Sequence, residues 1–165
     1  TALGARRMVS SLGPADLEGP GALGRAVRKL GEAHEVAAAN GLAFGVHNHW
    51  WEYQEVDGRM PYRVLLAELP PDVFFELDVY WMQTAGVDPA LAMAELAGRA
   101  QVGKPMVALG DGSLDIPAIV AANAPHSEWL IVELDECATD MLAAVERSLG
   151  YLVTSGLGMG RDRAS

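Results

Sequence analysis

The sequence Gly41-Leu-Ala-Phe-Gly-Val-His-Asn-His-Trp-Trp-Glu52 decides how the rest of the chain is interpreted. Its apolar part, residues 42–47, follows a glycine and has the composition of a buried strand. Side chains able to bind a metal ion, carry a proton or hold a sugar hydroxyl group come directly after it. In parallel α/β proteins, ligands bind at the carboxyl ends of the strands. This stretch is therefore expected to form one edge of an active site.

The segments on either side alternate between strand and helix patterns. Helix ends are marked by Asn40-Gly41, and helix starts by Asp88-Pro89, Asp115 and either Thr139 or Asp140. Such alternation predicts a parallel sheet covered by helices. In chain order we expect strands at 5–12, 42–47, 73–78 and 129–133, and helices at 23–40, 62–69, 88–98, 115–120 and 140–152.

The interval between the last two expected strands is nearly twice as long as the others. A strand belongs in this interval, but only residues 106–109 form an apolar run there. The glycine-rich segment 155–165 is expected to be a flexible tail of a single domain formed by residues 1–165.

Composition excludes several classes of function. The chain has 165 residues, of which 22 are acidic and 12 are basic, so its formal charge of −10 argues against a nucleic-acid partner. It contains neither a run of about 20 apolar residues nor a secretory signal, so no membrane partner is expected. Cys137 is the only cysteine. A disulfide framework is thereby excluded, and a cytoplasmic location is inferred.

Histidines and carboxylates end three of the expected strands. Because side chains alternate along a strand, each strand end presents a pair on one face. Carboxylates that converge from several strands repel one another unless a cation or shared protons compensate. Histidine with carboxylate ligands suits Mn²⁺, Zn²⁺, Co²⁺ or Fe²⁺, and mostly oxygen ligands suit Mg²⁺. The alternative is that these are solvated polar residues beside a sheet. The pairs are His47 with His49, Glu76 with Asp78, and Glu133 with Asp135.

Aromatic residues stand next to these candidate ligands. Flat apolar rings beside polar groups commonly receive the C–H faces of sugars, whereas the alternative is ordinary packing at a rim. The candidates for binding substrate are Trp50, Trp51, Tyr80 and Trp81.

Four motifs together resemble the sugar phosphate isomerase/epimerase family, whose fold is the xylose isomerase-like (β/α)8 TIM barrel. They occur in the family's order and span about residues 41–137. The motifs are Gly45-Val-His-Asn-His-Trp-Trp-Glu-Tyr53, Phe75-Glu-Leu-Asp-Val-Tyr-Trp81, Gly110-Asp-Gly-Ser-Leu-Asp-Ile-Pro-Ala-Ile119 and Trp129-Leu-Ile-Val-Glu-Leu-Asp-Glu-Cys137.

The resemblance implies a role for individual residues. A divalent metal ion (Mn, Mg, Co or Zn) would be held by His47 from strand five, Asp78 from strand six and Glu133 from strand eight. Glu133 would also act as the catalytic acid/base, while His49 and Glu52 would face the substrate as further catalytic residues.

The chain also departs from the family's pattern. A complete barrel of this type needs about 250 residues and eight strands. This chain begins near strand four, and the seventh strand, with its metal-binding histidine, is missing between Arg99 and Gly103. We therefore expect a partial barrel that lacks the N-terminal strands and strand seven.

Three functions remain open. The first is a metal-dependent isomerase or epimerase that moves a proton through an enediolate on a small carbohydrate. The second is a metal-dependent lyase or dehydratase acting on 3-keto-glycosides or inosose-like substrates. The third is a non-catalytic barrel fragment, a binding or assembly module that would need a partner chain or a homo-oligomer to cover its open edges.

Overall fold

A computed structural model describes residues 5–89, 92, 100–103, 107–124, 129–134, 137 and 139–160 of the chain. Its strands are β1 (Arg7–Ser11), β2 (Ala43–His47), β3 (Phe74–Asp78) and β4 (Ala100–Gly103). Its α-helices are α1 (Ala22–Ala39), α2 (Pro61–Glu68), α3 (Val79–Thr84), α5 (Ile116–Asn123) and α6 (Met141–Thr154), and two short 3-10 turns are η1 (Pro14–Leu17) and η2 (Trp51–Tyr53).

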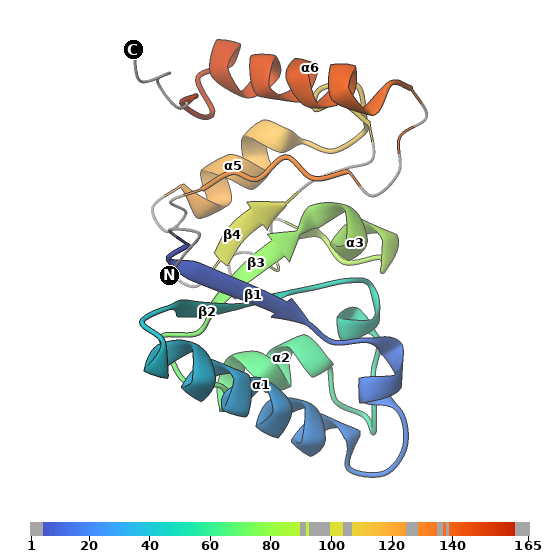
Figure 1. The fold of residues 1–165 in the computed structure, drawn as a ribbon. Helices are drawn as coiled ribbons and strands as arrows, with labels where there is room; N and C mark the ends of the chain where they lie inside the picture. Colours follow the sequence, from blue (N-terminus) through green and yellow to red (C-terminus); the bar gives the residue numbers. More distant parts are fainter. Residues whose placement is uncertain are drawn as a thin grey trace.

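The four strands form one parallel sheet in the order β1-β2-β3-β4. Helix α1 connects β1 to β2, and α2 connects β2 to β3, so both connections are the strand–helix–strand units that the alternation predicted. Figure 1 shows α1 and α2 side by side below the sheet, with α5 and α6 stacked above β4. The strands expected at 5–12, 42–47 and 73–78 are confirmed.

Helix α1 forms where apolar side chains recur at helical spacing. Leu23, Ala26 and Leu30 are buried on one face of this 18-residue helix. The helix ends at Asn40, and Gly41 adopts a φ of 70°, the left-handed conformation that glycine accepts without a steric penalty. The expected end of this helix is confirmed.

The alternation of side chains along β2 and β3 separates the core from the polar residues. Phe44 and Val46 of β2 are buried in one hydrophobic cluster with Phe75 and Leu77 of β3, and this cluster also contains Leu30 of α1. The residues between them point to the opposite face of the sheet. We call the face that packs against α1 the helix face, and the opposite face the inner face. The inner-face residues of the two strands include Gly45, His47, Phe74, Glu76 and Asp78.

Caps at the starts of the later helices also agree with expectation. Asp115 accepts a hydrogen bond from the backbone N–H of Ala118 at the start of α5, and Asp140 accepts one from Ala143 at the start of α6. Of the helix expected at 88–98, the backbone N–H of Ala92 donates to the carbonyl of Asp88, and most of the remaining residues lie outside the described part. Short helix α3 was not expected.

The strand expected at residues 129–133 is confirmed only as a single bridge residue, Leu130. The rest of residues 129–134 has no strand assignment, and the segment belongs to none of the four named strands of the sheet. Their apolar pattern predicted burial. Leu130 does pack against the core, whereas Trp129 is 53% exposed. A strand exists only where a neighbouring strand accepts its backbone hydrogen bonds, and an apolar pattern does not report the presence of that neighbour.

The expectation that a strand is missing between Arg99 and Gly103 is wrong. Strand β4 pairs with β3 in parallel, with Ala100 opposite Phe75 and Gly103 opposite Asp78. The sequence Ala-Gln-Val-Gly has one β-branched residue, so propensity gives almost no signal, and pairing with β3 determines its conformation. The weak apolar run at 106–109 is not a strand over residues 107–109, and Met106 lies outside the described residues.

Within the part of the chain that the structure describes, none of the helices combines the length and the apolar character needed to cross a lipid bilayer. Residues 155–160 of the expected tail follow α6 without helical structure, and the last five residues lie outside the described range.

Replacing Gly45 by alanine should destabilise the fold. Gly45 is paired with Phe74, and a methyl group at position 45 would overlap the Phe74 ring on the inner face. We expect the free energy of unfolding in urea to fall by about 1–3 kcal/mol, as for other overpacked sites. The matched control is Gly24→Ala on α1, where nothing lies within 4 Å and alanine should add about 0.5–1 kcal/mol. Equal effects at the two positions would contradict this account of Gly45.

Candidate active site

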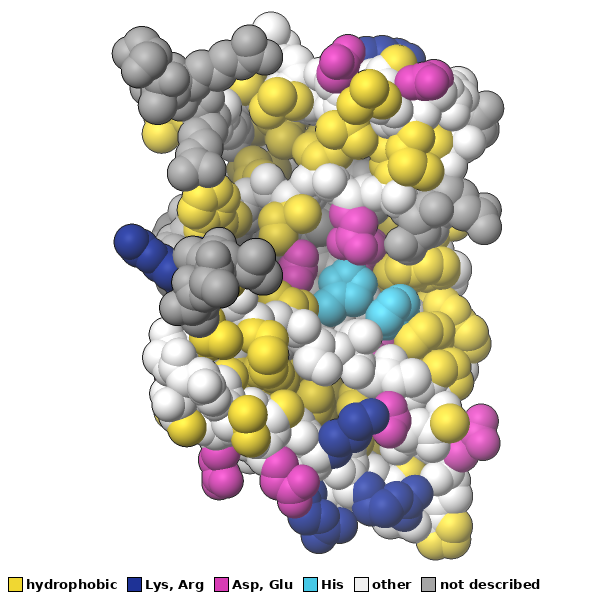
Figure 2. Space-filling view, in the orientation of Figure 1, with side chains coloured by type: hydrophobic (Ala, Val, Ile, Leu, Met, Phe, Trp, Pro, Cys, Tyr) yellow, Lys and Arg dark blue, Asp and Glu magenta, His cyan; other side chains and the backbone are white. Residues whose placement is uncertain are grey.

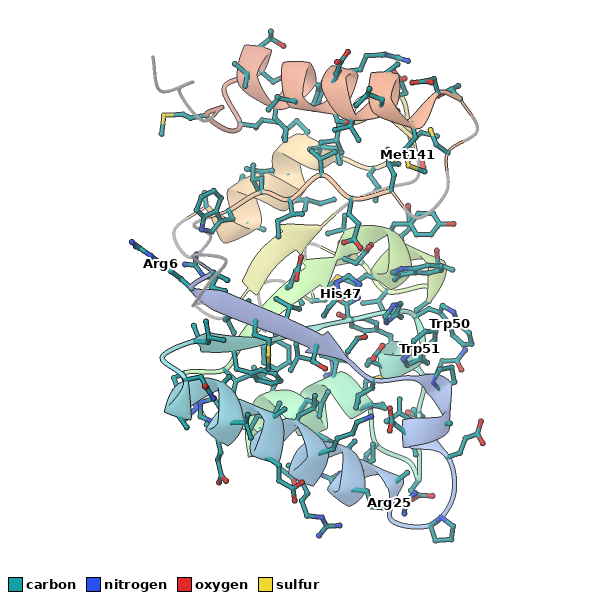
Figure 3. All side chains as sticks on the ribbon, in the orientation of Figure 1. Arg6, Arg25, His47, Trp50, Trp51 and Met141 are labelled. Carbon is teal, nitrogen blue, oxygen red and sulfur yellow. The ribbon has the colours of Figure 1, made fainter. Side chains whose placement is uncertain are left out.

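Three predicted metal ligands come together at the carboxyl ends of β2 and β3. One ring nitrogen of His47 and one carboxylate oxygen each of Asp78 and Glu133 lie within 4.8 Å of one another. His47 ends β2, Asp78 ends β3, and Glu133 comes from the extended segment that follows α5. Figure 2 shows the histidine side chains in contact with acidic ones at the centre of this face, and Figure 3 shows where His47 lies.

The donor set fits a divalent transition-metal ion. An imidazole nitrogen with two carboxylate oxygens is a combination that Mn²⁺, Co²⁺ and Zn²⁺ accept. The three ligand atoms are already close, so the backbone does not have to move to bring them together. His47 and Glu133 are partly buried and Asp78 is 3% exposed. The predicted ligands therefore fit the predicted metal.

Asp78 also begins α3. One oxygen of its carboxylate, Oδ1, accepts hydrogen bonds from the backbone N–H groups of Tyr80 at 2.8 Å and Trp81 at 3.1 Å. A carboxylate at this position stabilises a helix start, because the first N–H groups of a helix lack partners within the helix. These two bonds fix the rotation of the Asp78 side chain.

A further carboxylate, Glu76, lies beside the three ligands. It points to the same face of β3 as Asp78 and is opposite His47 in the register. Burial, together with the negative charge of Glu133, raises the pKa of Glu76. The sequence predicted Glu76 as a candidate ligand paired with Asp78, but the group of converging ligand atoms contains Asp78 and not Glu76. The position of Glu76 shows that acidic groups from separate segments do converge here, as expected.

Asn48 is a site residue that sequence reasoning missed. Its side chain is 4% exposed and forms two hydrogen bonds with the backbone of Asp78. An asparagine between two histidines looks like a loop residue, and nothing in the sequence indicates a partner 30 positions away. Only the pairing of β2 with β3 reveals it.

His49 lies beside His47, as the alternation along the chain predicted. Their ring centroids are 4.9 Å apart with an edge-to-face geometry. The ring of His49 also stacks on Trp51, with 4.2 Å between centroids and 17° between planes. Trp51 is held in turn by a hydrogen bond from its Nε1 to the carbonyl of Leu12, 3.0 Å long. The stacking of His49 on Trp51, which is itself hydrogen-bonded to Leu12, therefore orients the His49 ring.

The four aromatic residues predicted to bind substrate join His49 in a continuous series of ring contacts. The centroid distances are 5.4 Å for Trp50–Trp51, 6.1 Å for His49–Trp81 and 4.9 Å for Tyr80–Trp81. We call this series the aromatic row; each of its members is partly exposed. Figure 3 shows Trp50 and Trp51 at one end of the site. The aromatic row consists of Trp50, Trp51, His49, Trp81 and Tyr80.

Glu52 does not lie where a substrate-facing residue was expected. It is 1% exposed, and its Oε2 accepts a hydrogen bond from the backbone N–H of His49 at 2.8 Å. Its other oxygen and the hydroxyl group of Tyr53 are buried without a hydrogen-bond partner among the described residues. Burial raises the pKa of Glu52 to about 7, and burial with the charge of Glu52 raises that of Tyr53. The geometry makes Glu52 a residue that positions His49.

Comparison with known proteins gives no match to a protein-family model and none to a curated protein sequence. Solved structures do match. A sugar phosphate isomerase/epimerase from Parabacteroides distasonis has a TM-score of 0.86 at 24% identity, covering 95% of this chain and 62% of that protein. A 3-keto-D-glucoside 4-epimerase from E. coli has a TM-score of 0.62 at 21% identity, covering 87% and 57%.

A third match names the fold. It is a fusion protein described as a xylose isomerase-like TIM barrel joined to a 4-hydroxyphenylpyruvate dioxygenase, with a TM-score of 0.58 at 15% identity, covering 93% of this chain and 30% of that protein. At these identities the likeness shows the fold. The chain has the α/β fold of a xylose isomerase-like TIM barrel over the part that it spans, which is 62% of the Parabacteroides protein. The fold predicted from the four motifs is confirmed.

The burial of Glu52 predicts a pH-dependent stability. Its pKa rises from an ordinary 4.5 to about 7, so the folded state binds the proton more tightly than the unfolded chain does. This contribution to stability is complete below pH 4.5 and is lost as the pH rises through 7. Its size is on the order of 3 kcal/mol. The variant Glu52→Gln, which stays neutral and keeps an acceptor for His49, should not lose this stability as the pH rises.

Urea unfolding from pH 4.5 to pH 8 measures the difference. Glu52→Gln should match the wild type at the acidic end and exceed its free energy of unfolding at pH 8. Glu32→Gln, the same change on the exposed side of α1, should follow the wild type throughout. Parallel curves for Glu52→Gln and the wild type would contradict the prediction.

Proposed function

We propose that this protein is a divalent-metal-dependent isomerase or epimerase acting on a sugar or a sugar derivative. The observation that carries the proposal is the group formed by His47, Asp78 and Glu133, whose ligand atoms lie within 4.8 Å beside the aromatic row. Two structural relatives are themselves described as a sugar phosphate isomerase/epimerase and a 3-keto-D-glucoside 4-epimerase. The fold and the local chemistry thus support the same class of reaction.

His47, Asp78 and Glu133 would hold a divalent cation, whose charge would stabilise the negative charge that develops on the substrate during proton transfer. The charge of the site is consistent with this role, since burial and the charge of Glu133 raise the pKa of Glu76, and a cation would relieve the repulsion between the two carboxylates.

Proton movement at carbon needs a base and an acid close to the substrate. Glu133 is our choice for the base, and His49 would serve the opposite face of the reacting carbon. Removal of a proton beside a carbonyl group gives an enediolate. Delivery of a proton to the neighbouring carbon completes an isomerisation, and delivery of a proton to the other face of the original carbon completes an epimerisation. His49 suits the second role because its ring lies 4.9 Å from that of His47 and is held by Trp51.

The aromatic row favours a sugar with an apolar face or an apolar substituent. Trp50 stands at the end of the row, where an aglycone attached to the sugar would reach it. This observation supports the second candidate, a lyase or dehydratase that uses the same metal and base for β-elimination from a 3-keto-glycoside. Release of a free aglycone from such a substrate, without epimerised product, would select the lyase. Conversion of free sugars would select the isomerase or epimerase.

We also propose a cytoplasmic protein without a nucleic-acid partner, which the single cysteine and the acidic composition support. Self-association into a homo-oligomer is also proposed, because α6 exposes the large apolar side chains of Leu142, Leu149 and Val153. Failure of any divalent metal ion to bind, with no affinity for carbohydrates, would instead select the non-catalytic module.

Metal binding can be measured without an activity assay. Titration calorimetry with Mn²⁺ or Co²⁺ should show one site per chain in the wild type. His47→Ala should lose this site, because it removes the nitrogen ligand and leaves two carboxylates. His34→Ala is the matched control, since His34 lies on α1 and pairs with Asp72 at 3.0 Å, away from the site. Equal affinity in the wild type and His47→Ala would contradict the assignment.

Replacing Glu133 by glutamine should stop proton transfer while keeping an oxygen at the same place. In D₂O with the metal ion and a substrate, we expect incorporation of deuterium at carbon to fall at least about 100-fold. Glu146→Gln on the exposed side of α6 should leave the rate unchanged. Circular dichroism and calorimetry would confirm that both variants fold and bind metal. Retained exchange in Glu133→Gln would remove this residue from the role of base.

A further inference from the structure

We infer that Asn48 is a positioning residue that sets the distance and orientation of Asp78 relative to His47. This inference rests on the proposed metal site and adds a residue to it. Asn48 binds none of the reacting atoms in the proposal; its effect is on the geometry of two ligands.

The first step is the position at which the strand ladder stops. Strands β2 and β3 are paired from Gly45 opposite Phe74 to His47 opposite Glu76. Beyond this point the backbone of β2 no longer bonds to β3, yet Asp78 lies two residues further along β3. Without another contact, the ligand on β3 would be tied to β2 only through the preceding residues.

The second step is the side chain that bonds to Asp78 beyond the end of this pairing. The amide nitrogen Nδ2 of Asn48 donates to the backbone carbonyl of Asp78 at 3.1 Å, and its Oδ1 accepts from the backbone N–H of Asp78 at 2.9 Å. The side-chain amide thus satisfies both the backbone N–H and the backbone carbonyl of Asp78. Both bonds are buried, where few water molecules compete for them.

The third step is that Asp78 is held from three directions. Asn48 holds its backbone from the β2 side, Gly103 of β4 is its ladder partner on the other side, and α3 holds its carboxylate through Tyr80 and Trp81. Strand β4 and α3 fix Asp78 with respect to β3 alone. Asn48 adds two buried hydrogen bonds between Asp78 and the end of β2.

The fourth step is adjacency in the sequence. Asn48 follows His47 directly, so a single peptide unit joins the residue that supplies one ligand to the residue that holds the other. Any shift of Asn48 relative to Asp78 therefore changes the separation of the two ligand atoms. Groups that orient metal ligands typically change metal affinity about 10- to 100-fold when they are removed.

The experiment compares the wild type with Asn48→Ala and with a matched control. The control is Asn40→Ala, which removes an asparagine whose side chain also donates to a backbone carbonyl, that of Val36 at 2.8 Å, at the exposed end of α1. Co²⁺ titration followed by visible absorption reports both affinity and ligand geometry. We expect Asn48→Ala to bind Co²⁺ about 10- to 100-fold more weakly with an altered spectrum, and Asn40→Ala to match the wild type.

A purely structural role would lower the melting temperature of Asn48→Ala but leave the Co²⁺ affinity and spectrum of its folded form unchanged, and that result would overturn the inference. If Asn48→Ala does not fold, Asn48→Gln replaces it, because glutamine keeps the amide but displaces it by one methylene group. The Co²⁺ affinity and the spectrum of Asn48→Gln then decide between the positioning role and the purely structural role.

Metal-free crystal structures separate this inference from the proposed function. Displacement of the Asp78 carboxylate from His47 in the Asn48 variant, with the sheet intact, supports the positioning role even if the wild type binds no metal. An unchanged arrangement of the two side chains overturns it even if the wild type binds metal tightly.

Discussion

The parallel pairing of β2 with β3 is the constraint on which the rest of the structure depends. It places His47 opposite Glu76 and brings the carboxyl ends of both strands to the same level. Two histidines and two carboxylates that are about 30 residues apart in the chain therefore share one surface. Parallel strands need crossover connections, and α1 and α2 supply them while covering the helix face. The site exists because the sheet is parallel.

The same alternation that builds the core creates the electrostatic demand of the site. Side chains alternate along β3, so Phe75 and Leu77 point towards the helices while Glu76 and Asp78 point to the inner face. Polar groups brought out of water in this way lose hydration, and burial with the charge of Glu133 raises the pKa of Glu76. Backbone N–H groups meet part of the demand, and a cation would meet more of it. The stability and the chemistry of this surface are thus linked.

The strands with strong local patterns were predictable, and the two that depend on partners were not. Residues 129–133 have the better strand composition, but only Leu130 among them forms a bridge and none belongs to the four named strands. Residues 100–103 have little strand composition but form β4, because β3 offers an edge for them. Propensity is a local property, whereas membership of a sheet requires two segments to meet. The role of Asn48 was hidden for the same reason.

The sequence by itself determined the alternation of strands and helices, the helix caps at Gly41 and Asp115, and the identity of the candidate ligands, while the structure chose Asp140 over Thr139 as the cap of α6. These follow from side-chain chemistry and from spacing along one segment, which a single sequence records. Only the tertiary structure decided that Glu52 is buried under His49 rather than turned to the substrate, and that Asn48 reaches Asp78. Burial and contacts between distant segments arise from the pairing of whole elements, and no local pattern contains them.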